Sequence, residues 1–207
     1  MQVGKQRKDS DNKQQTQLSK KKKIYSKFQY KDKVFEIGDI CRFYNEQQDL
    51  IGKILSIVST DQNHPDFGKI NVQWYYYKKD LKFKGLGISE KDQNQISEQE
   101  VFPTNHQDKV YVQSLNGKCK IVTLEEFEQN PTVTPDIFFS RAEYDHINKV
   151  LKPSFNDWPK ICSCQKPQNP QQTYIQCDAC QQWFHPECQD TTVDIDSFIC
   201  MSCTSQK

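Results

Sequence analysis

Residues 162–203 read CSCQKPQNPQQTYIQCDACQQWFHPECQDTTVDIDSFICMSC, and the rest of the chain is interpreted outward from this stretch. It holds seven of the nine cysteines and one of the four histidines within 42 residues. Thiolate and imidazole are ligands that zinc prefers, and eight of them can form two closed tetrahedral sites. The expected zinc ligands are Cys162, Cys164, Cys177, Cys180, His185, Cys188, Cys200 and Cys203.

The two expected zinc ions are structural, because four protein ligands leave no open coordination position for a reacting water. A segment of about 45 residues cannot stabilise itself by burial alone. Zinc binding, worth about 10–16 kcal/mol in small zinc-finger peptides, would supply most of its folding free energy. The spacing leaves the pairing of the ligands open, since sequential and interleaved sets are both sterically feasible.

Charge is divided unevenly along the chain. Residues 1–33 hold eleven of the 28 Lys and Arg and three of the 27 Asp and Glu, which leaves 17 basic and 24 acidic residues in 34–207, a net charge of −7. An acidic folded part favours a basic peptide as partner, because wrapping DNA phosphates requires clustered positive charge. We therefore expect no direct DNA binding outside the basic N-terminal tail.

The N-terminal residues 1–27 are predicted to form a disordered basic tail, because they hold too few apolar groups to offset the entropy of ordering. Within it, Lys20–Lys23 fits either a nuclear-import or nucleic-acid contact or a merely solvated basic run. The tail lacks the apolar core of a secretory signal, and no stretch reaches the ~18 apolar residues of a membrane helix. We therefore expect no membrane partner and a reducing compartment, where clustered cysteines bind metals.

Residues 30 to about 151 are predicted to be mainly β, with short strands and few helices. Asn116-Gly117 is a hairpin-type turn signal between two apolar runs. Residues 78–98 are charged and Gln-rich, which predicts a long surface loop, either alone or with a short helix in it, and residues 123–128 fit a short helix or a continued strand. Strands are expected within 34–44, 50–58, 70–77, 110–115, 119–122 and 138–144.

A connector at residues 152–160 is too short to let two domains move freely. We expect the domains to touch, with Trp158 as a candidate for the contact.

The order of the ligands, four cysteines, one histidine and three cysteines, resembles that of a PHD finger. The WFHPEC run at 183–188 and Phe198 strengthen the resemblance. A RING domain, the alternative that would imply a ubiquitin ligase, has its histidine one ligand earlier. The resemblance implies a cross-brace: one zinc takes Cys162, Cys164, His185 and Cys188, and the other takes Cys177, Cys180, Cys200 and Cys203.

PHD fingers commonly bind the N-terminal tail of histone H3. The resemblance implies that Trp183 and Tyr174 are walls of a cage for trimethylated lysine and that Asp178 pairs with an arginine of the tail. Ring faces suit a quaternary ammonium, which has no proton to donate. Gln168 stands where related fingers place Tyr, so the expected cage is partial. The alternative is that Trp183 and Tyr174 pack the small core.

The β-rich region resembles a BAH (bromo-adjacent homology) domain, and the whole chain is similar to the plant BAH–PHD histone readers of the short-life and early-bolting type. The residues that carry the resemblance are Gly38-Asp39, Trp74-Tyr75-Tyr76, and the stretches 100–106, 117–119 and 136–144.

In that family the BAH domain binds trimethylated lysine 27 of H3 in a Tyr-Trp-Tyr cage. Trp74 and Tyr76 match two cage positions and share one strand face, while Leu50 takes the first Tyr position. By the same resemblance, His106 and Asp108 line the peptide groove. The alternative is that Trp74 and Tyr76 are core aromatics. Tyr75 and Tyr77 are expected to pack on the opposite face.

The chain is thus predicted to be a mainly β, non-enzymatic nuclear chromatin reader that binds methylated H3 tails and recruits or positions a chromatin complex. The alternative is a structural adaptor subunit that uses the same domains for contacts with other subunits of such a complex. The expected parts are a tail at 1–27, a BAH domain at 28–152, a linker at 153–160 and a PHD finger at 161–205.

Overall fold

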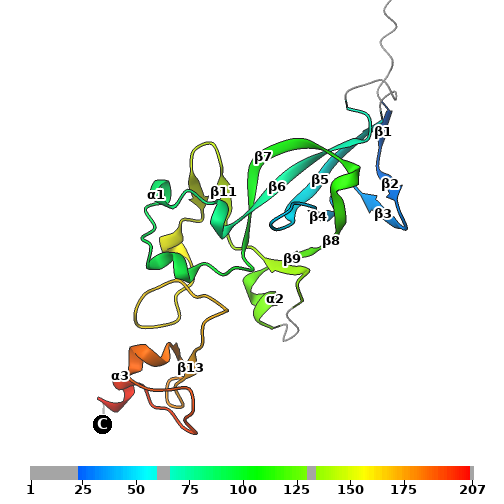
Figure 1. Ribbon diagram of the computed structural model, residues 1–207. Helices are drawn as coiled ribbons and strands as arrows, with labels where there is room; N and C mark the ends of the chain where they lie inside the picture. The colour runs from blue at the N-terminus through cyan, green and yellow to red at the C-terminus, as the bar shows by residue number, and fades with distance from the viewer. Residues whose placement is uncertain (1–22, 60–65, 130–133, 206–207) are drawn as a thin grey trace, which may run out of the picture.

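The computed structural model describes residues 23–59, 66–129 and 134–205, and this part of the chain is mainly β, as predicted (Figure 1). Most of the expected tail, with Lys20, Lys21 and Lys22, lies outside the described residues. The strands are β1 Lys23–Tyr25, β2 Lys27–Tyr30, β3 Lys33–Glu36, β4 Ile40–Phe43, β5 Leu50–Ser59, β6 Lys69–Tyr77, β7 Val101–Tyr111, β8 Leu115–Lys118, β9 Lys120–Val122, β10 Ile137–Phe139, β11 Glu143–Asp145, β12 Val150–Lys152, β13 Ile175–Gln176 and β14 Trp183–Phe184.

The helices are few and short. The α-helices are α1 Phe83–Leu86, α2 Leu124–Glu128 and α3 Met201–Thr204, and the 3-10 turns are η1 Lys78–Asp80, η2 Asp92–Gln95, η3 Val112–Ser114, η4 Phe155–Asp157 and η5 Pro186–Gln189. None of the described helices is long and apolar enough to cross a membrane.

One eight-stranded sheet forms the larger domain, in the order β12-β11-β7-β6-β5-β4-β8, with β1 also paired to β5. The long strands β5, β6 and β7 are antiparallel neighbours at its centre, and β11 joins β7 in parallel through Tyr144 and Thr104. Figure 1 shows the cysteine-rich domain, coloured orange to red, at the end of the molecule away from β1. The sheet thus presents β5, β6 and β7 side by side, and these strands build the site described below.

Two of the apolar clusters that pack on the sheet lie next to the site and the connector between the domains. One packs Phe43, Ile54 and Val72 between β4, β5 and β6. The other joins Phe102 of β7 to Trp158, which exposes only 2% of its surface and stacks on Phe102 with ring centroids 6.1 Å apart. The connector between the domains is therefore anchored in the core of the larger domain.

The hairpin predicted at Asn116-Gly117 is wrong. Both residues lie within β8, which pairs with β4, whereas β9 pairs in parallel with β10. Gly117 has a φ of 131° and lies opposite Arg42, where the β4–β8 register shifts. At this irregularity the backbone takes a positive φ, which a glycine adopts without strain.

Three other expectations change. Residues 78–98 are not a simple surface loop, because Leu81, Ile88 and Ile96 are buried against Trp158 in the second cluster. The single strand expected at 138–144 is divided between β10 and β11. Residues 23–25, expected in the disordered tail, form β1, which pairs with residues 57–59 of β5, beyond the stretch of β5 that pairs with β4.

Candidate functional site

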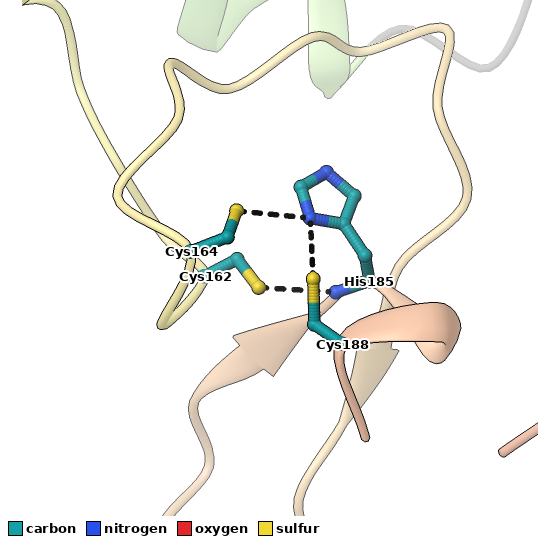
Figure 2. A group of neighbouring side chains, drawn as sticks. All are labelled: Cys162, Cys164, His185 and Cys188. Carbon is teal, nitrogen blue, oxygen red and sulfur yellow. Dashed lines mark hydrogen bonds between the residues drawn. The ribbon is translucent and has the colours of Figure 1, made fainter. Parts of the chain in front are cut away.

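The first candidate metal centre brings together Cys162, Cys164, His185 and Cys188, whose ligand atoms all lie within 4.8 Å of one another (Figure 2). His185 Nδ1 lies 3.5 Å from the sulfur of Cys164 and 3.8 Å from that of Cys188. Zinc–ligand distances of about 2.0–2.3 Å place tetrahedral neighbours roughly 3.5–3.8 Å apart. The side chains therefore fit one zinc ion without rearrangement.

The second centre gathers Cys177, Cys180, Cys200 and Cys203 within the same limit of 4.8 Å. The sulfurs of Cys180 and Cys200 are 3.9 Å apart. The backbone N–H of Cys200 donates to Cys177 Sγ and is the main cause that lowers the pKa of this thiol to about 6. The two sets interleave along the chain, so the structure holds the cross-brace that the PHD resemblance implied, and the clusters fit two structural zinc ions.

The short hairpin β13–β14 carries Trp183, which exposes 44% of its surface. Tyr174, just before β13, is half-buried, and its ring centroid lies 4.6 Å from that of His185. Its hydroxyl accepts a hydrogen bond from the backbone N–H of Asn169. Trp183 thus offers an open ring, whereas Tyr174 is largely occupied by contacts inside the finger.

Two other finger candidates are engaged elsewhere. Asp178 Oδ2 accepts hydrogen bonds from Ser197 Oγ at 2.9 Å and from the backbone N–H of Phe198 at 2.8 Å. Gln168 faces the larger domain, where its side chain donates to the Glu128 carboxylate. The structure therefore uses Asp178 to brace the loop before Cys200, and it places Gln168 at the domain interface.

In the larger domain, a cavity of about 450 Å³ lies over β5, β6 and β7. All five candidates from the sequence line it: Leu50 on β5, Trp74 and Tyr76 on β6, and His106 and Asp108 on β7. The other lining residues are Tyr75, Lys79, Asp80, Lys82, Tyr144 and Lys149.

A chain of hydrogen bonds ties the cavity's aromatic residues together. The Trp74 indole N–H donates to Asp108 Oδ2 at 2.9 Å, and the same oxygen lies 3.0 Å from His106 Nε2. His106 Nδ1 in turn lies 3.0 Å from the Tyr76 hydroxyl. These bonds cross from β6 to β7 and hold the ring planes in place.

Trp74 exposes only 7% of its surface and meets Phe43 edge to face, with centroids 5.3 Å apart. It is therefore both a cavity wall and a core residue. Tyr75 and Tyr77, predicted to pack on the opposite face, both belong to a separate apolar cluster with Ile51, Val101 and Phe138, and Tyr75 also lines the cavity.

Tyr144 is the main lining residue that sequence reasoning missed. It exposes 1% of its surface, and its ring lies 5.8 Å from that of Tyr76. It reaches the cavity through the parallel pairing of β11 with β7, a contact between residues 40 positions apart for which the sequence carries no local signal.

These features define a two-domain, mainly β protein whose second domain is a structural zinc module. The family model of the BAH domain matches residues 31–154, and that of the PHD-finger matches residues 162–203. The chain therefore belongs to the BAH-domain family and carries a PHD finger after the BAH domain.

Two relatives match about two thirds of the chain. "Chromatin remodeling protein SHL" of Arabidopsis thaliana is 31% identical over 148 residues, which cover 67% of this chain and 59% of that protein. "Chromatin remodeling protein EBS" of the same plant is 26% identical over 146 residues, 66% of this chain and 56% of that protein. The chain thus spans less than two thirds of the length of these relatives.

Two further likenesses cover one domain each. The Drosophila melanogaster "Nucleosome-remodeling factor subunit NURF301" is 44% identical over 46 residues, 20% of this chain and 2% of that protein. The yeast Rsc2 BAH domain is similar in structure over 61% of this chain and 53% of that chain, with 18% identity and a TM-score of 0.40. The fold assignment rests on the family models and not on this structural likeness.

Proposed function

We propose that this chain is a nuclear chromatin reader whose BAH domain and PHD finger each bind a segment of the histone H3 tail, with a methylated lysine as the anchor. Its output is the recruitment or positioning of a larger chromatin complex. The observation that carries the proposal is the convergence of Leu50, Trp74, Tyr76, His106 and Asp108, chosen from the sequence alone, on one cavity. The names of the relatives SHL and EBS support a role at chromatin.

The cavity offers a methylated lysine two kinds of attraction. The rings of Tyr76 and Trp74 present π-faces, each worth about 0.5–2 kcal/mol to a desolvated cation. Asp108 adds a carboxylate beside them. Leu50 supplies an aliphatic wall that contacts methyl groups without the electrostatic attraction of a ring.

Two of the lysines that line the cavity, Lys79 and Lys149, interact with other residues of the BAH domain. Lys79 Nζ lies 5.7 Å from the ring centroid of Tyr77, and Lys149 Nζ donates to the backbone carbonyl of His146. These contacts give Lys79 and Lys149 partners outside the candidate cage, whereas Lys82, which also lines the cavity, adds a positive charge there.

In the finger, Trp183 is the proposed main wall, because its ring is the more open of the two aromatic candidates. Tyr174 forms the second wall, and Asp178 contributes negative charge toward a basic peptide while its Oδ2 braces the loop at Phe198. With Gln168 at the domain interface, the proposed cage has two walls.

The second candidate function is a structural adaptor, and one observation favours it. Trp74 is 7% exposed and tied to Asp108, so it behaves largely as a core residue. An adaptor would bind other subunits of a chromatin complex through the same domains without reading methylation.

Titration of the zinc-loaded full chain with H3 peptides separates the two functions. Peptides that cover the first ten residues and the region around lysine 27, unmodified and trimethylated, are added in a calorimeter. A reader binds at least one of them at sub-millimolar concentration and prefers the methylated form. If no peptide binds in that range, the reader function is rejected in favour of the adaptor.

A further inference from the structure

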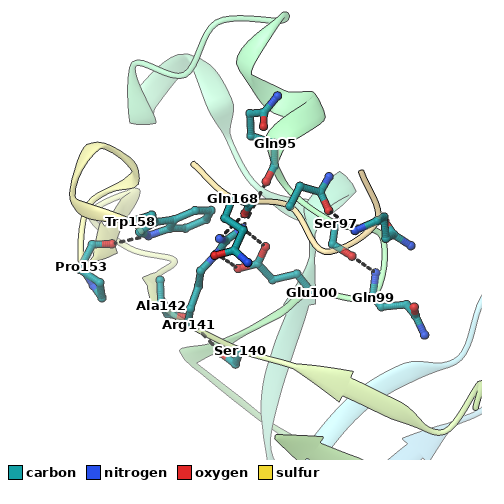
Figure 3. A network of polar contacts seen from close by, with 12 residues as sticks. Gln95, Ser97, Gln99, Glu100, Ser140, Arg141, Ala142, Pro153, Trp158 and Gln168 are labelled. Carbon is teal, nitrogen blue, oxygen red and sulfur yellow. Dashed lines mark hydrogen bonds and ion pairs between the residues drawn. The ribbon is translucent and has the colours of Figure 1, made fainter. Parts of the chain in front are cut away.

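Arg141 lies at the meeting point of the two domains and belongs to neither the zinc centres nor the BAH cavity (Figure 3). It follows β10, and its side chain is only 6% exposed. Its Nε and Nη2 donate to the two carboxylate oxygens of Glu100 at 2.8 and 2.9 Å. This two-pronged pairing fixes the plane of the guanidinium group.

The remaining contacts of the guanidinium fill the space around it. Nη2 also donates to the backbone carbonyl of Gln95 at 3.2 Å, and the Arg141 Cζ lies 4.1 Å from the ring centroid of Trp158. Burial raises the pKa of Glu100, and Arg141 opposes that rise. Arg141 is therefore held firmly from the BAH side.

One donor of Arg141 crosses to the finger. Nη1 donates to the backbone carbonyl of Gln168 at 2.5 Å. Neighbouring contacts follow the same path: Asn169 Nδ2 donates to the carbonyl of Asn94 at 2.8 Å, and the N–H of Glu98 donates to Gln171 Oε1 at 2.9 Å. Residues 168–171 are thus hydrogen-bonded to the BAH domain almost residue by residue.

The same segment leads directly into the finger's candidate site. The N–H of Asn169 donates to the Tyr174 hydroxyl at 3.0 Å, and the Tyr174 ring packs on His185. Gln172 Oε1 lies 3.0 Å from His185 Nε2. Since His185 turns its Nδ1 toward the thiols, Gln172 is the outer partner that orients this ligand ring.

We propose that Arg141 is a positioning residue that joins the two domains and holds residues 168–174 of the finger in the shape its peptide site requires. The effect on peptide binding rests on the proposed function above, whereas the joining of the domains does not. The BAH domain is then part of the finger's binding site without touching the peptide.

The first test compares Arg141→Lys with wild type by amide hydrogen exchange of the zinc-loaded full chain. Lysine keeps a positive charge opposite Glu100, but an ammonium lacks the planar fork needed to reach both Glu100 and the Gln168 carbonyl. We expect amides in 168–174 to exchange at least about ten-fold faster, while β5–β7 stay protected. Unchanged exchange in 168–174 would overturn the proposal.

Arg42→Lys is the matched control. Arg42 also bridges two acidic residues, Asp49 and Asp136, but both partners lie within the BAH domain. Its replacement should leave exchange in 168–174 unchanged, and faster exchange there in both variants would mean that Arg141 has no special role.

If Arg141→Lys also speeds amide exchange in β5–β7, a second pair of variants, Gln171→Ala and Gln176→Ala, separates an interface effect from general destabilisation. Gln171 Oε1 accepts from the BAH domain, whereas the Gln176 side chain donates to the Gln181 carbonyl inside the finger. Faster exchange in 168–174 for Gln171→Ala alone supports the proposal, and equal exchange in the two variants rejects it.

A further test measures by calorimetry how tightly wild type and Arg141→Lys bind the H3 N-terminal peptide. We expect Arg141→Lys to bind it about three- to ten-fold more weakly, within the range found for substitutions that act on a site without touching the ligand, with binding of the lysine 27 peptide unchanged. If wild type binds neither peptide, the proposed function fails, and the exchange experiment still decides the role of Arg141.

Discussion

Trp183 and Trp74 are both candidate cage walls, yet they differ in what else they do. Trp183 exposes 44% of its surface on a two-residue strand, whereas Trp74 exposes 7% and belongs to the main core. A substitution at Trp183 should therefore test binding without disturbing the fold, and a change near Trp74 should alter both.

Replacing Trp183 with Ala should abolish methyl-lysine binding by the finger and leave the zinc content at two ions per chain. The ring is the proposed main contact of the cation and is not one of the eight zinc ligands. Calorimetry with the methylated H3 peptide and a colorimetric zinc assay check the two halves of the prediction. Loss of zinc would show instead that Trp183 is a core residue.

Gly52→Ala tests the packing of Trp74, because Gly52 of β5 lies opposite Trp74 of β6. A Cβ on Gly52 would lie 3.0 Å from Phe43 Cε2 and 3.2 Å from Trp74 Cε3, so two buried rings must shift. We expect a loss of about 1–3 kcal/mol in the free energy of unfolding, as for other overpacked cores, measured by urea denaturation. A gain in stability, the usual result where alanine fits, would contradict the described packing.

Helix α2 is determined by a local interaction between residues at its N-terminus. Thr123 Oγ1 accepts from the N–H of Glu126 at 3.2 Å, and the Thr123 N–H donates to Glu126 Oε2 at 3.0 Å. This capping box selects the helix over the continued strand, the two options that the sequence left open for residues 123–128.

Thr123→Ala should lower the free energy of unfolding of the BAH domain by about 0.5–2 kcal/mol, since it leaves a helix N–H unpaired. Thermal unfolding of the full chain measures the change. Glu125→Ala is the control, because Glu125 lies in the same turn but outside the box. An equal loss in both variants would argue against the cap as the cause.

The strands show which features local sequence patterns can predict and which they cannot. Alternation along β6 correctly predicted that Trp74 and Tyr76 share one face of the strand and that Tyr75 and Tyr77 pack on the other, because alternation depends on neighbouring residues alone. It did not predict that Tyr75 also lines the cavity. The Asn116-Gly117 turn signal failed, since a glycine with positive φ also occurs at an irregularity within a strand. Which strand pairs with which is decided by contacts that no short window contains.

At the scale of the whole molecule, the two domains are stabilised in different ways. The BAH domain has several apolar clusters, whereas the finger's cluster consists mainly of its own zinc ligands with Phe184, Ile175 and Phe198. The eight zinc ligands could be predicted from residue type and spacing, whereas their division into two sets came from the resemblance to PHD fingers. The contacts of Arg141 with Gln168 were not, because they join residues 27 positions apart.

Removing zinc with a strong chelator should unfold residues 162–203 and leave the BAH sheet folded, because zinc supplies most of the folding free energy of so small a domain. Hydrogen exchange should show full loss of protection in the finger and unchanged protection in β5–β7. A finger that stays protected after complete zinc removal would contradict the structural role of the metal.

The interface around Arg141 also limits how the two modules can be exchanged. A chimera that grafts another finger after residue 160 would keep eight metal ligands, yet it would inherit Asn94, Glu98 and Glu128 without matching partners at positions 168–171. Such grafts should function only when both sides of the interface are transferred together. Between related chains, substitutions on the two sides are then expected to occur in compensating pairs, so that the two domains diverge as one unit.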